Sequence, residues 1–240
     1  MKDCKKDKSK IPMLKFDNNC SIPFSAIGTY EIKTNELEEI LKKYPFEKIV
    51  IDTAFKYHNE TEIAKIIYKY FERKNIIYIS KISYEQQEKS NVKETLKHTL
   101  ENLKIEFIDI YLIHSPRHRK VVETWKQMIE LKNIGLIKHI GVSNFQIQDI
   151  EKIYNETGVM PSINQIVLNT KDEKQSKLIN YCQENEILVQ IARPFGGKEN
   201  KDKISKKERD ELIYSLYENR IMSIIGTSNS QHMLENMQLY

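Results

Sequence analysis

Cysteine and glycine are both scarce in this sequence of 240 residues. The three cysteines, Cys4, Cys20 and Cys182, are far apart and form no Cys-x-x-Cys pair, so the sequence indicates neither a disulfide framework nor a thiolate zinc site. We therefore expect no metal, and unpaired cysteines suit a reducing, cytoplasmic location. With only 7 glycines, no Gly-x-Gly-x-x-Gly follows any apolar run, which disfavours a doubly wound dinucleotide-binding sheet.

Long apolar runs and an excess of one charge are also absent. No apolar stretch approaches the roughly 18 to 20 residues that span a bilayer, so we expect no membrane segment and no membrane partner. The 38 basic and 34 acidic residues are interleaved and leave a net charge of +4, which is too small to predict nucleic-acid binding. The first ten residues are rich in lysine without the apolar core of a signal peptide, and we expect residues 1–13 to form a polar, disordered leader.

After this leader, short runs rich in isoleucine and valine alternate with longer segments of helical periodicity. The predicted strands cover residues 26–29, 48–52, 76–81, 107–114, 138–142, 163–165, 187–191 and 222–226. The predicted helices cover residues 35–43, 59–73, 91–103, 121–133, 147–154, 172–185, 206–219 and 230–239. Eight strand–helix units predict an α/β fold, a (β/α)8 TIM barrel that forms a single domain over residues 14–240. An open doubly wound sheet is the alternative.

Four of the predicted strands end in polar residues of chemically useful kinds, namely Asp52, Lys81, His114 and Gln165. Tyr57 lies just beyond the end of the first of these four strands. A parallel barrel brings the carboxyl ends of its strands around one opening, so these side chains are expected to meet there. Singly, each has an ordinary structural explanation as a cap, a packing residue or a solvated charge. Together they predict an active site.

This combination of residues suits the transfer of a proton. A nearby ammonium favours the phenolate form of a tyrosine and is expected to lower the pKa of Tyr57. A carboxylate paired with that ammonium would keep Lys81 in place, and Asp52 is suitably located. A neutral His114 would hydrogen-bond the substrate oxygen as negative charge develops on it.

Several short motifs follow one another along the chain in an order typical of one enzyme family. They are Asp52-Thr53-Ala54 with Tyr57 and Asn59-Glu60, Ser80-Lys81, Ile113-His114-Ser115-Pro116, Gly141-Val142-Ser143-Asn144-Phe145, Asn164-Gln165, and Ile225-Gly226-Thr227-Ser228 with Glu235-Asn236. By these motifs the sequence resembles the aldo-keto reductases. The resemblance implies a TIM barrel that uses a nicotinamide cofactor to reduce the carbonyl groups of aldehydes or ketones to alcohols.

The resemblance also implies roles for the polar residues at the strand ends. Tyr57 would be the general acid, Lys81 and Asp52 would tune it, and His114 would orient the carbonyl. The alternative to this enzyme is a non-catalytic cofactor-binding or regulatory protein on the same barrel. For the enzyme, we expect a small-molecule carbonyl substrate and a monomer or weak homo-oligomer.

The cofactor is expected to be NADP(H) or NAD(H). The residues predicted to bind it are Gly28, Thr29, Ser143, Asn144, Gln165, Arg193, Pro194, Gly226, Thr227, Ser228, His232, Glu235 and Asn236. Hydroxyl and amide side chains supply the donors and acceptors that a carboxamide needs, which suits Ser143, Asn144 and Gln165. As an alternative, Ser143 or Asn144 caps the following helix. The polar turn that starts at Gly226 has the composition of a helix start, where backbone amides can bind phosphate.

The sequence departs from the family pattern at three places. Gly226 and His232 occupy the positions of a lysine and an arginine that hold the 2′-phosphate, which leaves the choice between NADPH and NADH open. Ala192 and Arg193 replace a tyrosine and a serine before Pro194, and Arg193 is predicted to reach the pyrophosphate or the substrate, or else to be a surface charge. The region after Phe195 is short and the C-terminal tail is truncated, which predicts an open, weakly selective site.

Overall fold

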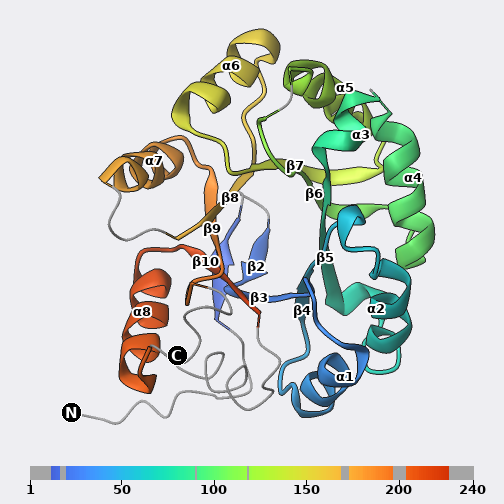
Figure 1. The fold of residues 1–240 in the computed structure, drawn as a ribbon, viewed down its shortest axis with the longest axis vertical. Coiled ribbons are helices and arrows are strands. Elements are labelled where there is room, and N and C mark those ends of the chain that lie inside the picture. The colour runs from blue at the N-terminus through green and yellow to red at the C-terminus, as the bar shows by residue number, and fades with distance from the viewer. Residues whose placement is uncertain are drawn as a thin grey trace.

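A computed structural model of the chain describes residues 12–16, 20–89, 91–117, 119–168, 173–196 and 204–226. Figure 1 shows a ring of strands surrounded by helices. The predicted leader lies outside the described residues except at its last two positions, and so does the last predicted helix at residues 230–239.

Eight parallel strands close into a barrel in the order β10-β3-β4-β5-β6-β7-β8-β9. They are β3 Ser25–Gly28, β4 Ile49–Asp52, β5 Ile76–Ile82, β6 Ile108–Ile113, β7 Ile137–Ser143, β8 Ile163–Val167, β9 Leu188–Ala192 and β10 Met222–Ile225. Each begins and ends within two residues of its predicted bounds. The predicted TIM barrel is therefore confirmed, and the doubly wound alternative is wrong.

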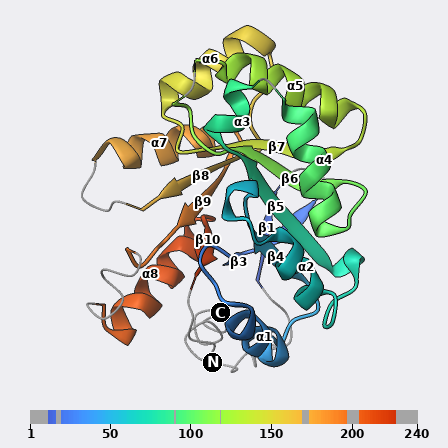
Figure 2. The same cartoon turned by 45° about the vertical axis from the view of Figure 1, so that its right-hand side comes forward.

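The helices lie outside the strands, as Figure 2 shows from another side. They are α1 Thr34–Lys43, α2 Glu60–Ile67, α3 Tyr84–Glu88, α4 Val92–Leu103, α5 Val121–Asn133, α6 Ile147–Thr157, α7 Glu173–Glu184 and α8 Lys206–Glu218. Side chains cap the starts of α4 and α8. Ser205 and Glu208 form a capping box at the start of α8, for example. Among the described residues, none of these helices combines the length and the apolar character that a membrane span requires.

Helix α2 is shorter than the helix predicted over residues 59–73, because tertiary contacts override the helical pattern after Ile67. Beyond it, Arg73 begins the short 3₁₀ helix η2 (Arg73–Asn75). The Arg73 guanidinium donates to the carbonyl oxygens of Ile76 and Phe107 and pairs with Asp109 at 2.8 Å. A continuous helix would carry Arg73 away from those partners. The hydrogen bonds of its guanidinium therefore favour a helix α2 that ends before Arg73.

An antiparallel hairpin precedes the barrel and was not predicted. Strands β1 (Met13–Lys15) and β2 (Ser21–Pro23) lie across the ring in Figure 1. Leu14, Ile22 and Phe24 are buried. Because Phe24 immediately precedes the first residue of β3, the hairpin covers the amino ends of the barrel strands. The carboxyl ends face the other way.

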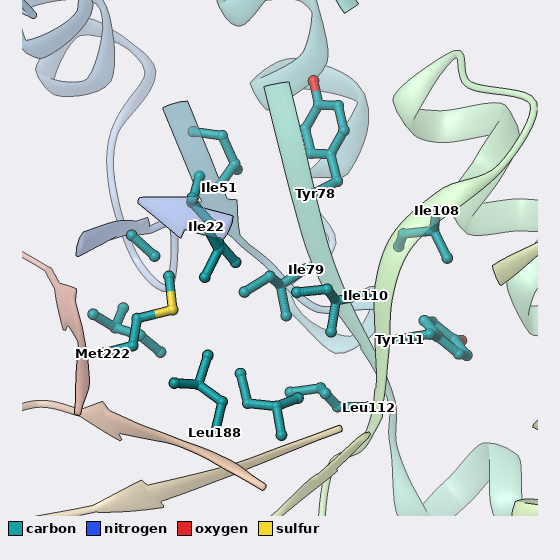
Figure 3. Packing of buried hydrophobic residues seen from close by; sticks show 14 of the residues in the cluster. Ile22, Ile51, Tyr78, Ile79, Ile108, Ile110, Tyr111, Leu112, Leu188 and Met222 are labelled. Atoms are coloured by element: carbon teal, nitrogen blue, oxygen red, sulfur yellow. The ribbon is translucent and has the colours of Figure 1, made fainter. Parts of the chain in front are cut away.

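The interior of the barrel is apolar over most of its length. Figure 3 shows Ile79, Ile110 and Leu112 pointing into the space between the strands, whereas Tyr78 and Tyr111 point away from it. The interior is tightly packed around Gly141 on β7. A Cβ atom there would lie 2.4 Å from Ile163 Cγ2 and 2.7 Å from Leu112 Cδ2, so only glycine fits.

Candidate active site

The carboxyl ends of β4, β5 and β6 bring three of the predicted residues to one place. Asp52 is the last residue of β4, Lys81 is the last but one of β5, and His114 directly follows β6. Tyr57 is the last residue of the 3₁₀ helix η1 (Phe55–Tyr57). The left-handed conformation of His58 ends this helix, at φ 54°.

The loop that carries Tyr57 is tied to its neighbours through Asn59. The Asn59 amide donates to the carbonyl oxygen of Thr29 at 2.8 Å and accepts from the hydroxyl of Thr53 at 3.4 Å. Glu60 follows and is buried, with its carboxylate accepting from the Ser80 hydroxyl at 2.8 Å and from the Asn102 amide at 3.1 Å. These contacts anchor the loop to β3 and β5 and so fix where Tyr57 lies.

Lys81 and Asp52 form a buried ion pair. Lys81 Nζ lies 2.7 Å from Asp52 Oδ1, and the two side chains are 0% and 5% exposed. The same ammonium donates to the carbonyl oxygen of Thr53 at 2.8 Å. Burial lowers the pKa of Lys81, but the charge of Asp52 and the contribution of Tyr57 outweigh it, and the net pKa lies above its ordinary value. The lysine is therefore charged at neutral pH.

Tyr57 lies close to both Lys81 and His114. Lys81 Nζ is 5.5 Å from the centroid of the Tyr57 ring, and the centroids of the Tyr57 and His114 rings are 6.1 Å apart. Burial raises the pKa of Tyr57, and Lys81 acts in the opposite direction without cancelling it. The sequence-based expectation of a lowered pKa is wrong for the net shift, because removing the phenolate from water outweighs the attraction of the ammonium.

His114 is neutral at neutral pH, as predicted. Burial lowers its pKa to about 4, with further contributions from the positive charges of Lys81 and Lys56. A neutral imidazole retains one N–H donor and one acceptor nitrogen. It is therefore suited to hydrogen-bond an oxygen atom in the same space as the Tyr57 hydroxyl.

A second group of predicted residues lies next to this one, on β7 and β8. Ser143 is the last residue of β7, whereas Gln165 lies in the middle of β8 and not at the strand end that the sequence predicted, because β8 continues to Val167. Gln165 Nε2 donates to Asp52 Oδ2 at 2.7 Å, so the amide contacts the ion pair directly. Asn144 donates from its backbone to the carbonyl oxygen of Gln165 at 2.8 Å and from its side chain to Ser143 Oγ at 3.0 Å. The N-cap of α6 is Gln146, so the alternative that Ser143 or Asn144 caps this helix is wrong.

Gln190 is part of the same network and was missed by the sequence analysis. It is buried in the middle of β9, and its Oε1 accepts from Gln165 Nε2 at 2.7 Å. The residues beside it, Val189 and Ile191, are apolar, so its strand is recognised by hydrophobicity alone. A single amide in such a strand is the signal that would have revealed it, because buried amides need partners.

Three further predicted cofactor residues lie around the end of β3. Gly28 pairs in register with Asp52, and a Cβ atom on it would lie 2.8 Å from Ile224 Cγ2. Thr29 is buried and donates from its hydroxyl to the carbonyl oxygen of Asp52 at 3.1 Å. Gly226 follows β10 and is exposed, and no atom of the described residues lies within 4 Å of the place where its Cβ would stand. Five other predicted residues, Thr227, Ser228, His232, Glu235 and Asn236, lie outside the described residues.

Arg193 lies at the rim of this end of the barrel, directly after β9. It adopts a left-handed backbone conformation at φ 53°, which is unusual for a residue with a long side chain. Its guanidinium carbon is 5.5 Å from the centroid of the Tyr30 ring, and Tyr30 in turn packs 5.0 Å from Tyr57. Pro194, the next residue, is buried. Arg193 is thus placed beside the candidate active site.

The residues present fit a nicotinamide carboxamide. Among the described residues, none donates a hydrogen bond to Gln165 Oε1, and none accepts one from the Ser143 hydroxyl. An acceptor and a donor therefore remain available side by side on neighbouring strands, as β7 and β8 pair Ser143 with Gln165. Within the described part of the chain, no group of three or more His, Cys, Asp or Glu side chains is placed to hold a metal ion.

A closed parallel barrel with a buried ion pair beside a tyrosine at the carboxyl ends of its strands defines a TIM-barrel enzyme. The chain belongs to the aldo/keto reductase family, whose model matches residues 28–213. As a member of this family it is an NAD(P)H-dependent oxidoreductase that acts on carbonyl compounds.

Individual relatives agree with this assignment. The chain is 29% identical over 288 residues to aldo-keto reductase family 1 member C18 of Rattus norvegicus, covering 97% of this chain and 87% of that protein. A solved aldo/keto reductase from Brucella melitensis is 27% identical, with a TM-score of 0.81 and coverage of 96% and 94%. A Bombyx mori aldo-keto reductase solved in complex with NADP has the same fold, at 24% identity, a TM-score of 0.81 and coverage of 96% and 88%.

Proposed function

We propose that this chain reduces the carbonyl group of small aldehydes or ketones to an alcohol with Tyr57 as the general acid. Lys81 and Asp52 tune that acid, and His114 orients the carbonyl oxygen. The observation that carries this proposal is the buried pair of Lys81 and Asp52, 2.7 Å apart, with the ammonium 5.5 Å from the centre of the Tyr57 ring. Burying two charges is unfavourable unless they pair well, so packing alone gives little reason to place them there.

The four side chains have complementary tasks in this reaction. The nicotinamide, when bound, supplies the hydride. The raised pKa keeps Tyr57 protonated at neutral pH, so its hydroxyl can donate a proton to the carbonyl oxygen. The charge of Lys81 stabilises the phenolate that remains. Neutral His114 donates a hydrogen bond to the same oxygen as negative charge develops on it.

The proposed cofactor site continues from Ser143 on β7 and Gln165 on β8 to the rim. Ser143, Asn144 and Gln165 would hold the carboxamide, and Arg193 would supply a positive charge for the pyrophosphate. Gly28, Thr29, Pro194 and Gly226 would let the cofactor backbone approach closely, together with the predicted residues beyond 226. Because Gly226 carries no cation, this site offers no charge at that position for a 2′-phosphate, and we leave both NADP(H) and NAD(H) as candidates.

The test is a fluorescence titration of the purified protein with NADPH and NADH, followed by a turnover assay with a generic aldehyde. Binding together with turnover would support the reductase, and the ratio of the two Kd values would decide the cofactor preference. Binding without turnover would favour the non-catalytic alternative. No binding of either cofactor would overturn the proposal.

The same proposal includes the setting in which the enzyme works. We expect a monomer or weak homo-oligomer. We expect it in the cytoplasm because unpaired cysteines such as the buried Cys182 persist in a reducing compartment. Light scattering at several protein concentrations would measure the oligomeric state, and a stable large assembly would contradict this part of the proposal.

A further inference from the structure

Gln190 is an unusual residue for the inside of this barrel. It is 0% exposed and lies between apolar neighbours on β9. A buried amide that lacks partners destabilises a protein, so the contacts of this side chain identify what it does. Both of its polar atoms have a neighbour among the described residues. Oε1 accepts from Gln165 Nε2 at 2.7 Å, and Nε2 lies 3.3 Å from Met222 Sδ.

The contacts of Gln165 fix the orientation of its amide group. An amide nitrogen carries two hydrogens, and here one goes to Asp52 Oδ2 and the other to Gln190 Oε1, each at 2.7 Å. Asp52 is paired with Lys81 and is therefore a carboxylate, which can only accept. The nitrogen of Gln165 must then face Asp52, and the reverse orientation would set two oxygens against each other.

The neighbour of Gln190 on β10 settles the direction of the second amide in the same way. A thioether sulfur is a weak acceptor and cannot donate, so Met222 favours the nitrogen of Gln190 on its side. The oxygen of Gln190 is then turned toward Gln165. Both hydrogens of Gln165 are used, whereas its acceptor oxygen, Oε1, receives no hydrogen bond from the described residues.

We propose that Gln190 is a positioning residue that holds the Gln165 amide with its oxygen directed at the NH2 group of the cofactor carboxamide. This inference rests on the proposed function, since it requires a carboxamide at that place. It adds a second consequence. Asp52 binds Lys81 through Oδ1 and Gln165 through Oδ2, so one carboxylate holds both the lysine that tunes the proposed proton donor and the glutamine that would hold the cofactor.

The test uses a cofactor that lacks the NH2 group. The 3-acetylpyridine analogue of the oxidised cofactor has a methyl group in its place and cannot donate to Gln165. Calorimetric Kd values of the natural cofactor and the analogue are compared for the wild type and for Q190M, which keeps the size of the side chain but removes its acceptor. The wild type should bind the natural cofactor about tenfold more tightly, as expected for one buried hydrogen bond. In Q190M this preference should fall at least about threefold.

Two further variants separate positioning from general loosening of the barrel. Ser223 on β10 is buried and shares a hydrogen bond of 3.1 Å with Ser25, without contact to Gln165, so S223A should keep the preference of the wild type. Q190N, whose side chain is one methylene shorter, serves as the second test should Q190M not fold.

The possible outcomes are distinct. An unchanged preference in Q190M or Q190N would overturn the inference, and so would an equal loss of preference in S223A. A wild type that binds the natural cofactor and the analogue equally would overturn it too, because Gln165 would then make no use of the NH2 group. A wild type that binds neither would overturn the proposed function together with the inference.

Discussion

At the amino ends of its strands the barrel is closed by apolar side chains, whereas at the carboxyl ends it is lined by charges and amides. Leu14, Ile22 and Phe24 of the hairpin region are at most 5% exposed at the first end. Asp52 and Lys81 are buried just as deeply at the second. Burial of an aliphatic side chain contributes about 1.5 to 3 kcal/mol to stability, while a buried ion pair contributes little or nothing net.

The two ends of the barrel therefore have different roles. The apolar end and the packed interior stabilise the fold, and the polar end uses part of that stability to hold charged groups out of water. Substitutions at the polar end should therefore change chemistry or charge state, and where they leave a buried charge without its partner they should lower stability as well. Substitutions at the apolar end should change stability alone. The following predictions test that separation.

The largest effect is expected for Y57F. It removes the proposed proton donor, so kcat should fall about 10²- to 10⁴-fold, with the Kd for the cofactor unchanged. Steady-state reduction of an aldehyde and a fluorescence titration measure the two quantities. The matched control is Y30F, which removes the hydroxyl of the exposed neighbouring ring and should retain turnover. Full activity in Y57F would remove Tyr57 from the role of general acid.

The second prediction concerns stability at the polar end. K81M leaves Asp52 buried without its ion-pair partner, so the free energy of unfolding should fall by about 3 to 5 kcal/mol. Guanidinium denaturation measures it. Lys42 pairs with Glu39 on the surface, where both side chains are about half exposed, and K42M should cost less than about 1 kcal/mol. Equal small losses in both variants would show that the buried pair carries no special energetic weight.

The third prediction concerns the apolar end. I22A removes a side chain that is 1% exposed at the closed end of the barrel, and the free energy of unfolding should fall by about 3 kcal/mol. The KM for the aldehyde and the Kd for the cofactor should not change at a temperature where the variant is folded. A loss of cofactor affinity would show that the two ends of the barrel are coupled.

The smallest effect is expected from the titration of His114. Its pKa is about 4 in the folded chain and 6.5 ordinarily, so between these values the unfolded chain binds more protons. Stability from this group is fully present above pH 6.5 and is lost as the pH falls toward 4. Between pH 7 and pH 5 the loss should be about 2 kcal/mol. H114Q cannot titrate, so its denaturation curve should respond less to this change of pH. An equal response in both proteins would contradict the prediction.

The sequence predicted the barrel well because hydrophobic periodicity is strong where one side of an element is buried. Helix α5 (Val121–Asn133) has its predicted bounds, and its buried Trp125 and Met128 lie on one face. Elements without such a pattern were missed. The polar α3 (Tyr84–Glu88) buries a single residue, and the hairpin strands are three residues each. Their positions depend on contacts with the rest of the barrel.

The structure brings the predicted residues Asp52, Tyr57, Lys81 and His114 together, and the expected neutral state of His114 agrees with its lowered pKa, but the pKa of Tyr57 shifts opposite to the prediction. Polar residues that end an apolar run, such as Asp52 and Lys81, can be recognised in the sequence. The direction of the Tyr57 pKa shift depends on how far burial outweighs an ammonium, which only the folded structure specifies. Gln190 escaped notice because its strand is otherwise apolar, and its partner, Gln165, comes from a different strand.

The hydrogen bond between Gln165 and Asp52 has a consequence for the barrel as a whole. It joins β8 to β4, which lie four places apart in the ring of eight and therefore on opposite sides of the barrel. If the chain were cut at Gly135, between β6 and β7, the first half-barrel would keep the acceptor Asp52 and the second would keep the donor Gln165. Each half would then expose its own group without the partner. Neither fragment should persist as a folded unit, and mixing them should restore the bond only when the two halves close on each other.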